Sequence, residues 1–177
     1  MRIIAGKHRG RALAQFRGNA VRPTPDRVKE SLFQVLGARL SGARVLDLFC
    51  GSGALGLESL SRGAREAVFN DASRDSLAIC KKNIAALGEH AQVYNLDFRN
   101  CLMRVGGRFD VIFADPPYAE RFTQEALTLI ARGGLLEEGG VVVWESEREE
   151  TPPEGWRLAD RRSYGRTKVF LFERSNA

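Results

Sequence analysis

Five short apolar segments, separated by stretches of helical length, occupy most of the chain after Gly42. They are rich in Val, Ile and Phe, are bounded by Gly, Asp or Pro, and comprise residues 44–49, 66–71, 92–97, 109–117 and 140–146. Such runs are typical of strands that are buried on both faces of a parallel sheet. Helices between consecutive strands imply right-handed crossovers, so the sequence predicts a doubly wound α/β sheet.

The C-terminal end departs from this alternation. Residues 156–165 and 166–174 are both strand-like and have no helical segment between them. This arrangement predicts an antiparallel hairpin that closes one edge of the sheet and brings the total to seven strands, most of them parallel.

The N-terminal forty residues are organised differently again. Residues 2–14 resemble a short hairpin that turns through Gly6 to Gly10, and a helix is expected after it. Thr24 is the candidate N-cap of that helix and Pro25 its first residue. Its apolar stripe would pack on the body of the protein and leave two basic side chains outside; the stripe is Val28, Leu32, Leu36 and Leu40, and the basic residues are Arg27 and Lys29.

Basic residues are concentrated in the same segment. Residues 1–40 contain nine Lys or Arg and two acidic residues, a net charge of +7, whereas the whole chain carries +5. A positive segment on a nearly neutral body is typical of a polyanion-binding protein, although a solvated basic surface is the alternative. The candidate contacts to nucleic acid are Arg2, Lys7, His8, Arg9, Arg11, Arg22 and Arg27.

Composition limits the class of protein. With 44% hydrophobic and 28% charged residues in 177 positions, the chain suits one folded domain with a small appendage. We find no apolar run long enough to cross a membrane and no export signal after Met1, so a cytoplasmic protein without a membrane partner is expected. A monomer is the default expectation for the oligomeric state. Cys50, Cys80 and Cys101 are dispersed and only two histidines are present, which predicts neither a disulfide framework nor a metal site.

The sequence "DLFCGSGALG", residues 47–56, has the glycine spacing of a dinucleotide-binding loop, and Asp71 follows about 20 residues on. Glycines let the backbone approach a ligand, and the next helix offers free N–H groups, which suits NAD, FAD or S-adenosylmethionine alike. Asp47 would repel a pyrophosphate but attract an ammonium and a sulfonium. The loop therefore favours S-adenosylmethionine, with Asp71 accepting hydrogen bonds from the ribose.

A second motif, Asp-Pro-Pro-Tyr at residues 115–118, closes the fourth predicted strand. Two prolines end the strand and stiffen the backbone at the edge where open α/β sheets bind ligands. The exocyclic amine of a nucleobase is a poor nucleophile, because its lone pair is conjugated into the ring. Acceptors at Asp115 and the carbonyl of Pro116 would hold both amine protons and turn the lone pair toward a methyl group, while Tyr118 stacks on the base.

At these residues the chain resembles S-adenosylmethionine-dependent amino-methyltransferases of the D/N-P-P-Y/F type. A closer likeness rests on "RIIAGKHRGRALA", "RPTPDRVKESLF", "DLFCGSGALGLESLSRGA", "DPPY" and "ES" after the fifth strand, in that order. These stretches look like the bacterial family that methylates the N2 amine of a guanine in small-subunit (16S) ribosomal RNA, and the likeness covers nearly the whole chain. It implies a Rossmann-like methyltransferase domain at 41–177 and an RNA-binding extension at 1–40, acting on a partly assembled ribosomal subunit.

The resemblance also implies site residues. The implied catalytic residues are Asp115, Pro116, Pro117 and Tyr118, and the implied cofactor contacts are Asp47, Gly51, Gly53, Asp71, Asp97, Phe98 and Thr24, with Asp97 and Phe98 at the adenine. The chain has Asn70-Asp71 where the family often has an apolar residue followed by Glu, which leaves open which of the two meets the ribose. Cys50 is interpreted as a small residue that fills space in the glycine loop.

Several alternatives are kept at this point. The same chemistry would serve an adenine in DNA or a protein amide, and a nucleotide-sensing RNA-binding module would need no catalysis. A nicotinamide oxidoreductase is disfavoured by Asp47 and has no use for the Asp-Pro-Pro-Tyr motif. Glu145 could hydrogen-bond near the active site, although the polar end of a strand explains its position equally well. Trp144 and Trp156 are expected to pack in the core or an interface.

Overall fold

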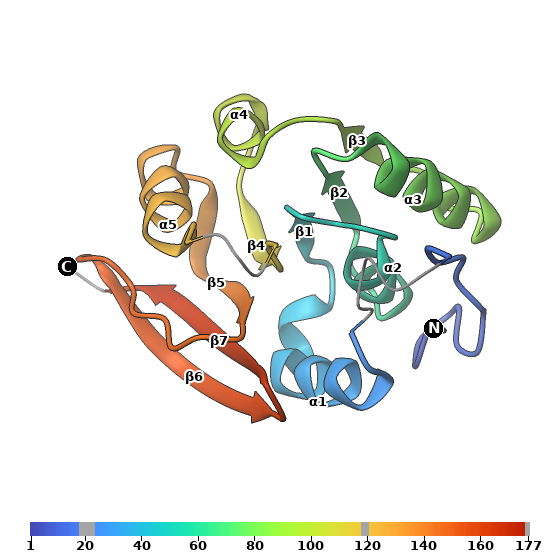
Figure 1. Cartoon of the computed structure of the whole chain (residues 1–177), viewed down its shortest axis with the longest axis horizontal. Helices are drawn as coiled ribbons and strands as arrows, with labels where there is room; N and C mark the ends of the chain where they lie inside the picture. Colours follow the sequence, from blue (N-terminus) through green and yellow to red (C-terminus); the bar gives the residue numbers. More distant parts are fainter. Residues whose placement is uncertain (18–23, 118–120, 176–177) are drawn as a thin grey trace.

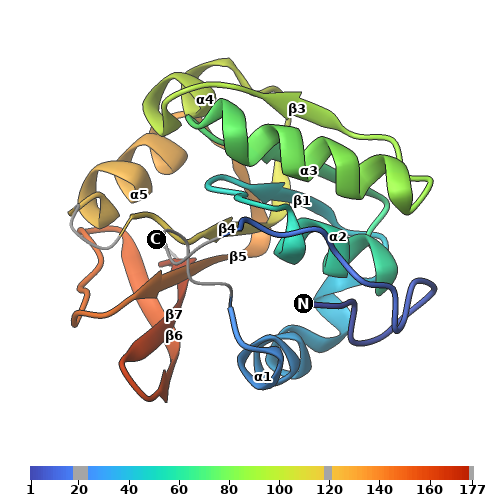
Figure 2. The ribbon, with the colours of Figure 1, turned by 45° about the vertical axis from the view of Figure 1, so that its right-hand side comes forward.

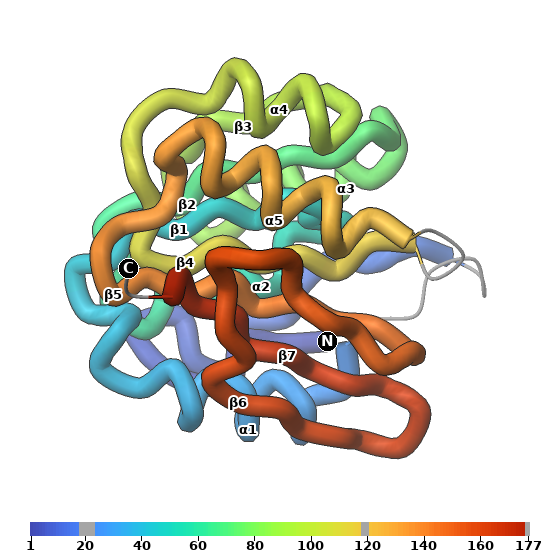
Figure 3. The backbone as a smooth tube through the Cα atoms, turned by 90° about the vertical axis from the view of Figure 1, so that its left-hand side faces the viewer, coloured from blue at the N-terminus to red at the C-terminus, as the bar shows by residue number. Residues whose placement is uncertain are grey.

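The computed structural model describes residues 1–17, 24–117 and 121–175. Its sheet has seven strands in the order β3-β2-β1-β4-β5-β7-β6 (Figure 1). The strands are β1 (Arg44–Asp47), β2 (Glu66–Asn70), β3 (Gln92–Tyr94), β4 (Phe109–Ala114), β5 (Leu136–Ser146), β6 (Trp156–Tyr164) and β7 (Thr167–Arg174). Neighbours among β1 to β5 pair in parallel, whereas β7 pairs antiparallel with both β5 and β6. The predicted Rossmann-like class and the C-terminal hairpin are therefore confirmed, and Figure 3 shows β3 and the β6–β7 hairpin at opposite edges of the sheet.

Helices cover both faces of the sheet. They are α1 (Asp26–Leu36), the 3₁₀ helix η1 (Gly37–Leu40), α2 (Ala54–Ser61), α3 (Arg74–Ala86), α4 (Phe98–Arg104) and α5 (Thr123–Arg132). Apolar residues of α1, α2 and α3 share one buried cluster with alternate residues of the strands, whereas those of α4 and α5 share a second cluster with the other strand residues. Figure 1 shows α4 and α5 on one side of the sheet and α1 and α2 on the other.

The strands differ from the sequence prediction at their ends. β1, β2, β3 and β4 each end at the last residue that is paired with a neighbouring strand, earlier than predicted; these residues are Asp47, Asn70, Tyr94 and Ala114. The chain continues past β1 to Leu48 and past β3 to Leu96. The side-chain amide of Asn70 donates hydrogen bonds to the carbonyl oxygens of both residues, in place of a backbone N–H from a neighbouring strand. β5 begins earlier than predicted, at Leu136, which pairs with Phe109 before a shift in register.

The N-terminal segment forms the expected hairpin and docks on α2. Arg2 pairs antiparallel with Ala12, and Ile3 N donates to Arg11 O at 2.9 Å. Lys7 N donates to Ser61 O at the end of α2, also at 2.9 Å. A Cβ on Gly6 would lie 1.8 Å from that same oxygen, so the close approach requires glycine. Figure 2 shows the hairpin, in dark blue, beside α2.

Lys29 is fully buried, and the prediction that it lies outside is wrong. Its Nζ donates to Arg2 O at 2.9 Å and lies 3.5 Å from Oε2 of Glu58, which is equally buried. Glu58 also accepts from Ile4 N at 3.0 Å and pairs with Arg62 at 2.9 Å. Burial lowers the pKa of Lys29, and the Glu58 charge opposes that change. This charged cluster joins α1, α2 and the hairpin, which is why a lysine can occupy the inner face of α1.

The start of α1 also differs from the prediction. Pro25 occupies the N-cap position in an extended conformation, and its carbonyl accepts from Val28 N at 3.0 Å. No side chain caps the helix, so the N-cap role expected for Thr24 is wrong. The expected apolar stripe of α1 and η1 is confirmed, and Arg27 is exposed as predicted.

Among the residues that the structure describes, no helix has the length and apolar character needed to cross a bilayer. All three cysteines are free and buried, and Trp144 and Trp156 pack in the core, as the sequence indicated.

Candidate functional site

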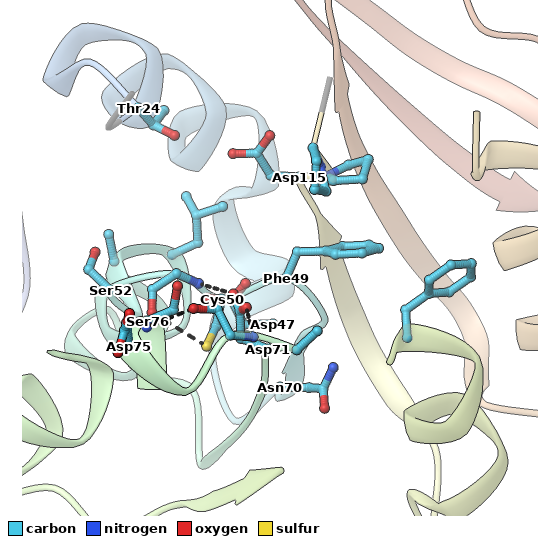
Figure 4. A pocket seen from close by; sticks show the side chains of 18 of the residues that line it. Thr24, Asp47, Phe49, Cys50, Ser52, Asn70, Asp71, Asp75, Ser76 and Asp115 are labelled. Carbon is cyan, nitrogen blue, oxygen red and sulfur yellow. Dashed lines mark hydrogen bonds between the residues drawn. The ribbon is translucent and has the colours of Figure 1, made fainter. Parts of the chain in front are cut away.

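A cavity of about 700 Å³ opens at the carboxyl ends of β1, β2 and β4 (Figure 4). Its volume lies within the roughly 300–1,000 Å³ of small-ligand sites. The loops that follow these strands supply most of the wall, and the N-terminal segment adds Met1, Phe16 and Thr24. The site therefore lies at the edge of the sheet where parallel α/β folds bind their ligands.

The glycine loop wraps one end of this cavity. Gly51 and Gly53 have φ values of +54° and +87°, a region that side chains disfavour. Gly51 N donates to Asp71 Oδ2 at 2.9 Å, which ties the loop to the end of β2. A Cβ on Gly53 would lie 2.8 Å from the sulfur of Cys80, so the loop is packed closely from behind. Gly51 faces the cavity, while Gly53 shapes the start of α2 without lining the cavity.

Gly56, the third glycine, lets α2 lie against β2. A Cβ at this position would come within 2.4 Å of the Phe69 ring. We expect Gly56→Ala to lower the free energy of unfolding by about 1–3 kcal/mol, measured by urea denaturation, because an added methyl forces the helix and strand apart. Gly106→Ala is the control, since a Cβ there meets nothing within 4 Å. Equal stability of the two variants would contradict the close packing.

The cavity wall carries five carboxyl groups and, among the described lining residues, no basic side chain; the acids are Asp47, Asp71, Asp75, Asp97 and Asp115. Asp47, at the end of β1, is 2% exposed and accepts from Gly56 N at 3.0 Å. Burial raises the pKa of Asp47 to about 7. Burial, reinforced by the charges of Glu145 and Asp47, also raises the pKa of Asp115 well above its usual value. A positively charged ligand would stabilise the ionised forms of these buried carboxyl groups. The cavity therefore favours a cationic ligand.

Aromatic rings form another part of the wall. Phe98, at the start of α4, lies 5.6 Å from the ring of Phe49 and 4.7 Å from that of Phe122, measured between centroids. The Arg99 guanidinium stacks over Phe98 at 4.5 Å. Asp97 caps α4 by accepting from Arg99 N at 3.0 Å. An apolar surface beside a carboxylate suits a planar heterocycle with exocyclic polar groups.

The neighbours Asn70 and Asp71 have different surroundings. Asn70 is buried, donates both amide protons to backbone carbonyls and accepts from Leu96 N at 3.2 Å. Asp71 is partly exposed and accepts one backbone N–H on each oxygen, from Gly51 and Ser73. Each of its oxygens keeps a second lone pair, so Asp71 is the one with capacity for a ligand.

Comparison with known proteins agrees with this geometry. The family model described as "Conserved hypothetical protein 95" matches residues 1–173. The chain belongs to this family. It is 40% identical to "Putative rRNA methyltransferase YlbH" of Bacillus subtilis over 98% of this chain and 99% of that protein. It is 36% identical to the "Ribosomal RNA small subunit methyltransferase D" of Escherichia coli K12, over 98% of this chain and 90% of that one.

A solved structure supports the same relationship. The "Putative methyltransferase yhhF" of Escherichia coli superimposes with a TM-score of 0.88 at 34% identity, covering 98% of this chain and 97% of that one. The rRNA methyltransferase family indicated by the sequence motifs is thus confirmed, as is the methyltransferase fold.

Most of the catalytic and cofactor-binding residues that the sequence predicted line this cavity. The lining includes Thr24, Asp47, Gly51, Asp71, Asp97, Phe98, Asp115, Pro116 and Pro117. Tyr118 and Arg22 lie outside the described residues. Sequence reasoning missed Phe16, Phe49, Asp75 and Phe122; of these, Phe49 was within a predicted strand and Phe122 follows the second motif closely. Cys50 is buried in the loop, as interpreted.

The candidate RNA contacts that the structure describes lie on the hairpin and α1, outside the cavity wall. Several have intramolecular partners: Arg2 lies 3.8 Å from Asp26, Lys7 and His8 both contact Glu89, and Arg11 donates to Ala86 O. Arg9 and Arg27 are exposed. In the described parts of the chain, no group of three or more His, Cys, Asp or Glu is arranged to hold a metal ion.

Proposed function

We propose that this protein methylates the exocyclic N2 amine of one guanine in small-subunit (16S) ribosomal RNA, with S-adenosylmethionine as the methyl donor. The observation that carries the proposal is the acidic cavity without a basic side chain among its described lining residues, which opens beside the Asp-Pro-Pro segment at the end of β4. The names of the relatives support ribosomal RNA as the substrate. We further propose that residues 1–40 bind RNA, residues 41–177 carry the methyl-transfer site, and the protein works as a cytoplasmic monomer on a partly assembled subunit.

The cavity fits S-adenosylmethionine in charge and size. Asp47 and the Gly51 loop would hold the charged methionine end, near Thr24. Asp71 would accept hydrogen bonds from the ribose hydroxyls, and Asp97 with Phe98 would contact the adenine. When bound, this cofactor supplies an electrophilic methyl group on a sulfonium. Because the charged side chains of the described wall are all carboxylates, a dinucleotide with its pyrophosphate is disfavoured.

The residues after β4 are assigned to the guanine. Asp115 and the carbonyl of Pro116 would accept the two protons of the N2 amine, so that its lone pair faces the methyl group. Pro117 restricts the backbone that follows, and Tyr118 would stack on the base. Asp115 then accepts or anchors the proton that the methylated amine loses. A guanine within folded RNA must leave its stack to reach these groups.

Exposed arginines of the N-terminal segment are expected to grip the RNA backbone. We expect the double substitution Arg9→Gln/Arg27→Gln to weaken RNA binding and to reduce the slope of log K against log salt, by about 0.7–0.9 for each phosphate that is no longer neutralised. The measurement is RNA affinity at several salt concentrations. Arg104→Gln/Arg108→Gln removes two exposed arginines near the start of β4, away from the cavity, and should leave the slope unchanged. If both double variants have the wild-type slope, the hairpin and α1 do not form the RNA-binding surface.

The substrate class can be tested with one labelled donor. We would supply tritiated S-adenosylmethionine with small-subunit particles that lack the modification, free 16S RNA, duplex DNA or a protein mixture. Label in RNA alone, free or within particles, is the expected result. Label in DNA, or in protein and stable to nuclease, would replace the proposal with an adenine or protein-amide methyltransferase that uses the same motif.

A further inference from the structure

Glu145 lies beside Asp115 at the carboxyl edge of the sheet. Trp144 of β5 pairs with Ala114 of β4, so the residues that follow them are neighbours. Trp144 and Ala114 both face the cluster under α4 and α5. By the alternation of strand side chains, Asp115 and Glu145 face the opposite side, toward α1 and α2. Glu145 is 7% exposed, and the interaction of its carboxyl with that of Asp115 is one cause of the raised pKa of Asp115.

Two carboxyl groups can hydrogen-bond only if one of them carries a proton. Burial raises the pKa of Glu145 to about 7, and burial with the Glu145 charge raises that of Asp115. Asp47, on the adjacent strand β1, adds a further negative charge rather than a neutralising one. The pair therefore keeps a proton near neutral pH, as two like charges in one buried site must.

Lys168 of β7 and two polar residues of α1, Lys29 and Ser31, have partners other than Glu145. On β7, Lys168 pairs with Ser146 in register, and its Nζ donates to Glu147 O at 3.3 Å. On α1, Lys29 is held by Glu58, and Ser31 bonds to the Tyr164 hydroxyl of β6. Among the described residues, Asp115 is the group whose side chain acts on the pKa of Glu145.

We propose that Glu145 is a positioning residue for methyl transfer: it fixes the Asp115 carboxyl through one shared proton, so that the other Asp115 oxygen faces the incoming amine. The proposal rests on the proposed function, because the orientation matters only if Asp115 contacts the nucleobase. A carboxyl that can rotate would present its acceptor in several directions, whereas a carboxyl held by its neighbour presents it in one.

Single-turnover methyl transfer at saturating RNA and S-adenosylmethionine tests the positioning. We expect Glu145→Ala to lower the rate about 10- to 100-fold, because Asp115 loses its orientation. KM for RNA and the Kd for the cofactor should stay within about twofold, since Glu145 does not line the cavity. Glu145→Gln keeps a hydrogen-bond donor toward Asp115 and should recover most of the rate. Glu138→Ala, an exposed acid on the same strand, is the matched control and should match the wild type.

A folded Glu145→Ala variant with the wild-type rate would overturn the proposal. Wild-type protein that transfers no methyl group to any RNA would instead overturn the proposed function. The two failures are therefore distinguishable in one set of assays.

The shared proton has a test that needs no substrate. An acid whose pKa is raised by folding stabilises the folded state fully below its unfolded pKa, and this contribution is lost as the pH rises through the folded pKa. The wild-type free energy of unfolding should therefore fall between about pH 4.5 and pH 7 and above. Glu145→Gln should match the wild type near pH 5 and be the more stable protein at pH 8. Parallel stability curves for the two proteins would show that no proton is shared, and would overturn the proposal even if Glu145→Ala fails to fold.

Discussion

Asp115→Ala is expected to lower the rate of methyl transfer by about 10²- to 10⁴-fold, the range typical of the removal of a proton-transfer or orienting group. Asp115 follows β4 directly and lines the cavity together with Pro116 and Pro117. Removal of its carboxyl leaves the amine of the guanine without the acceptor that orients its lone pair. Affinity for S-adenosylmethionine should change by no more than a few-fold, since Asp47, Asp71 and the glycine loop are untouched.

Two further variants sharpen this experiment. Asp115→Asn retains one carbonyl acceptor and should lose less activity than Asp115→Ala. Asp110→Asn alters an aspartate of the same strand whose Oδ2 accepts from Arg44 N at 2.8 Å, outside the cavity, and should keep the wild-type rate. If Asp115→Ala transfers methyl groups at the wild-type rate, Asp115 has no role in methyl transfer.

The largest expected effect on stability is at Glu58. Glu58→Ala would leave the ammonium of Lys29 buried without its counterion and would remove the acceptor for Ile4 N. Breaking a buried ion pair by removal of one partner costs about 3–5 kcal/mol, and we expect a loss of that size in urea denaturation. The hairpin should also become sensitive to proteolysis, because Glu58 holds it on α2.

An exposed ion pair provides the comparison for this variant. Glu149 pairs with Arg161 on the surface, and Glu149→Ala should show no measurable change in stability. If Glu58→Ala is as stable as Glu149→Ala, the buried cluster is not what joins the hairpin, α1 and α2.

Local patterns in the sequence were sufficient for the order of elements along the chain and for several acidic residues of the cavity wall. Short apolar runs separated by helical segments define the strands of a parallel sheet, and polar residues after such strands meet at one edge. This reasoning places Asp47, Asp71 and Asp115 around one cavity, as the structure does. The antiparallel end followed in the same way, from two strand-like segments without a helix between them.

What the sequence did not predict depends on interactions between distant residues. Lys29 follows Val28 in α1 and has the character of a surface residue; Glu58 on another helix and the carbonyl of Arg2 in the hairpin make its burial favourable. For Glu145 the sequence left two interpretations open, a hydrogen bond near the active site and the polar end of a strand, because the β4–β5 register that sets it beside Asp115 is not visible in either segment alone. The N-cap of α1 was misplaced by one residue, since Pro25 and Thr24 are both compatible with a helix start.

Analysis of the methylated nucleoside tests the central claim most directly. Small-subunit particles lacking the modification would be incubated with the protein and S-adenosylmethionine, and their RNA would be digested and examined by mass spectrometry with fragment mapping. The account predicts N2-methylguanosine at a single position, absent when Asp115→Ala replaces the wild-type protein. A methyl group on a ring nitrogen, on a ribose or on adenine would contradict the assignment of the Asp-Pro-Pro segment to the N2 amine of guanine.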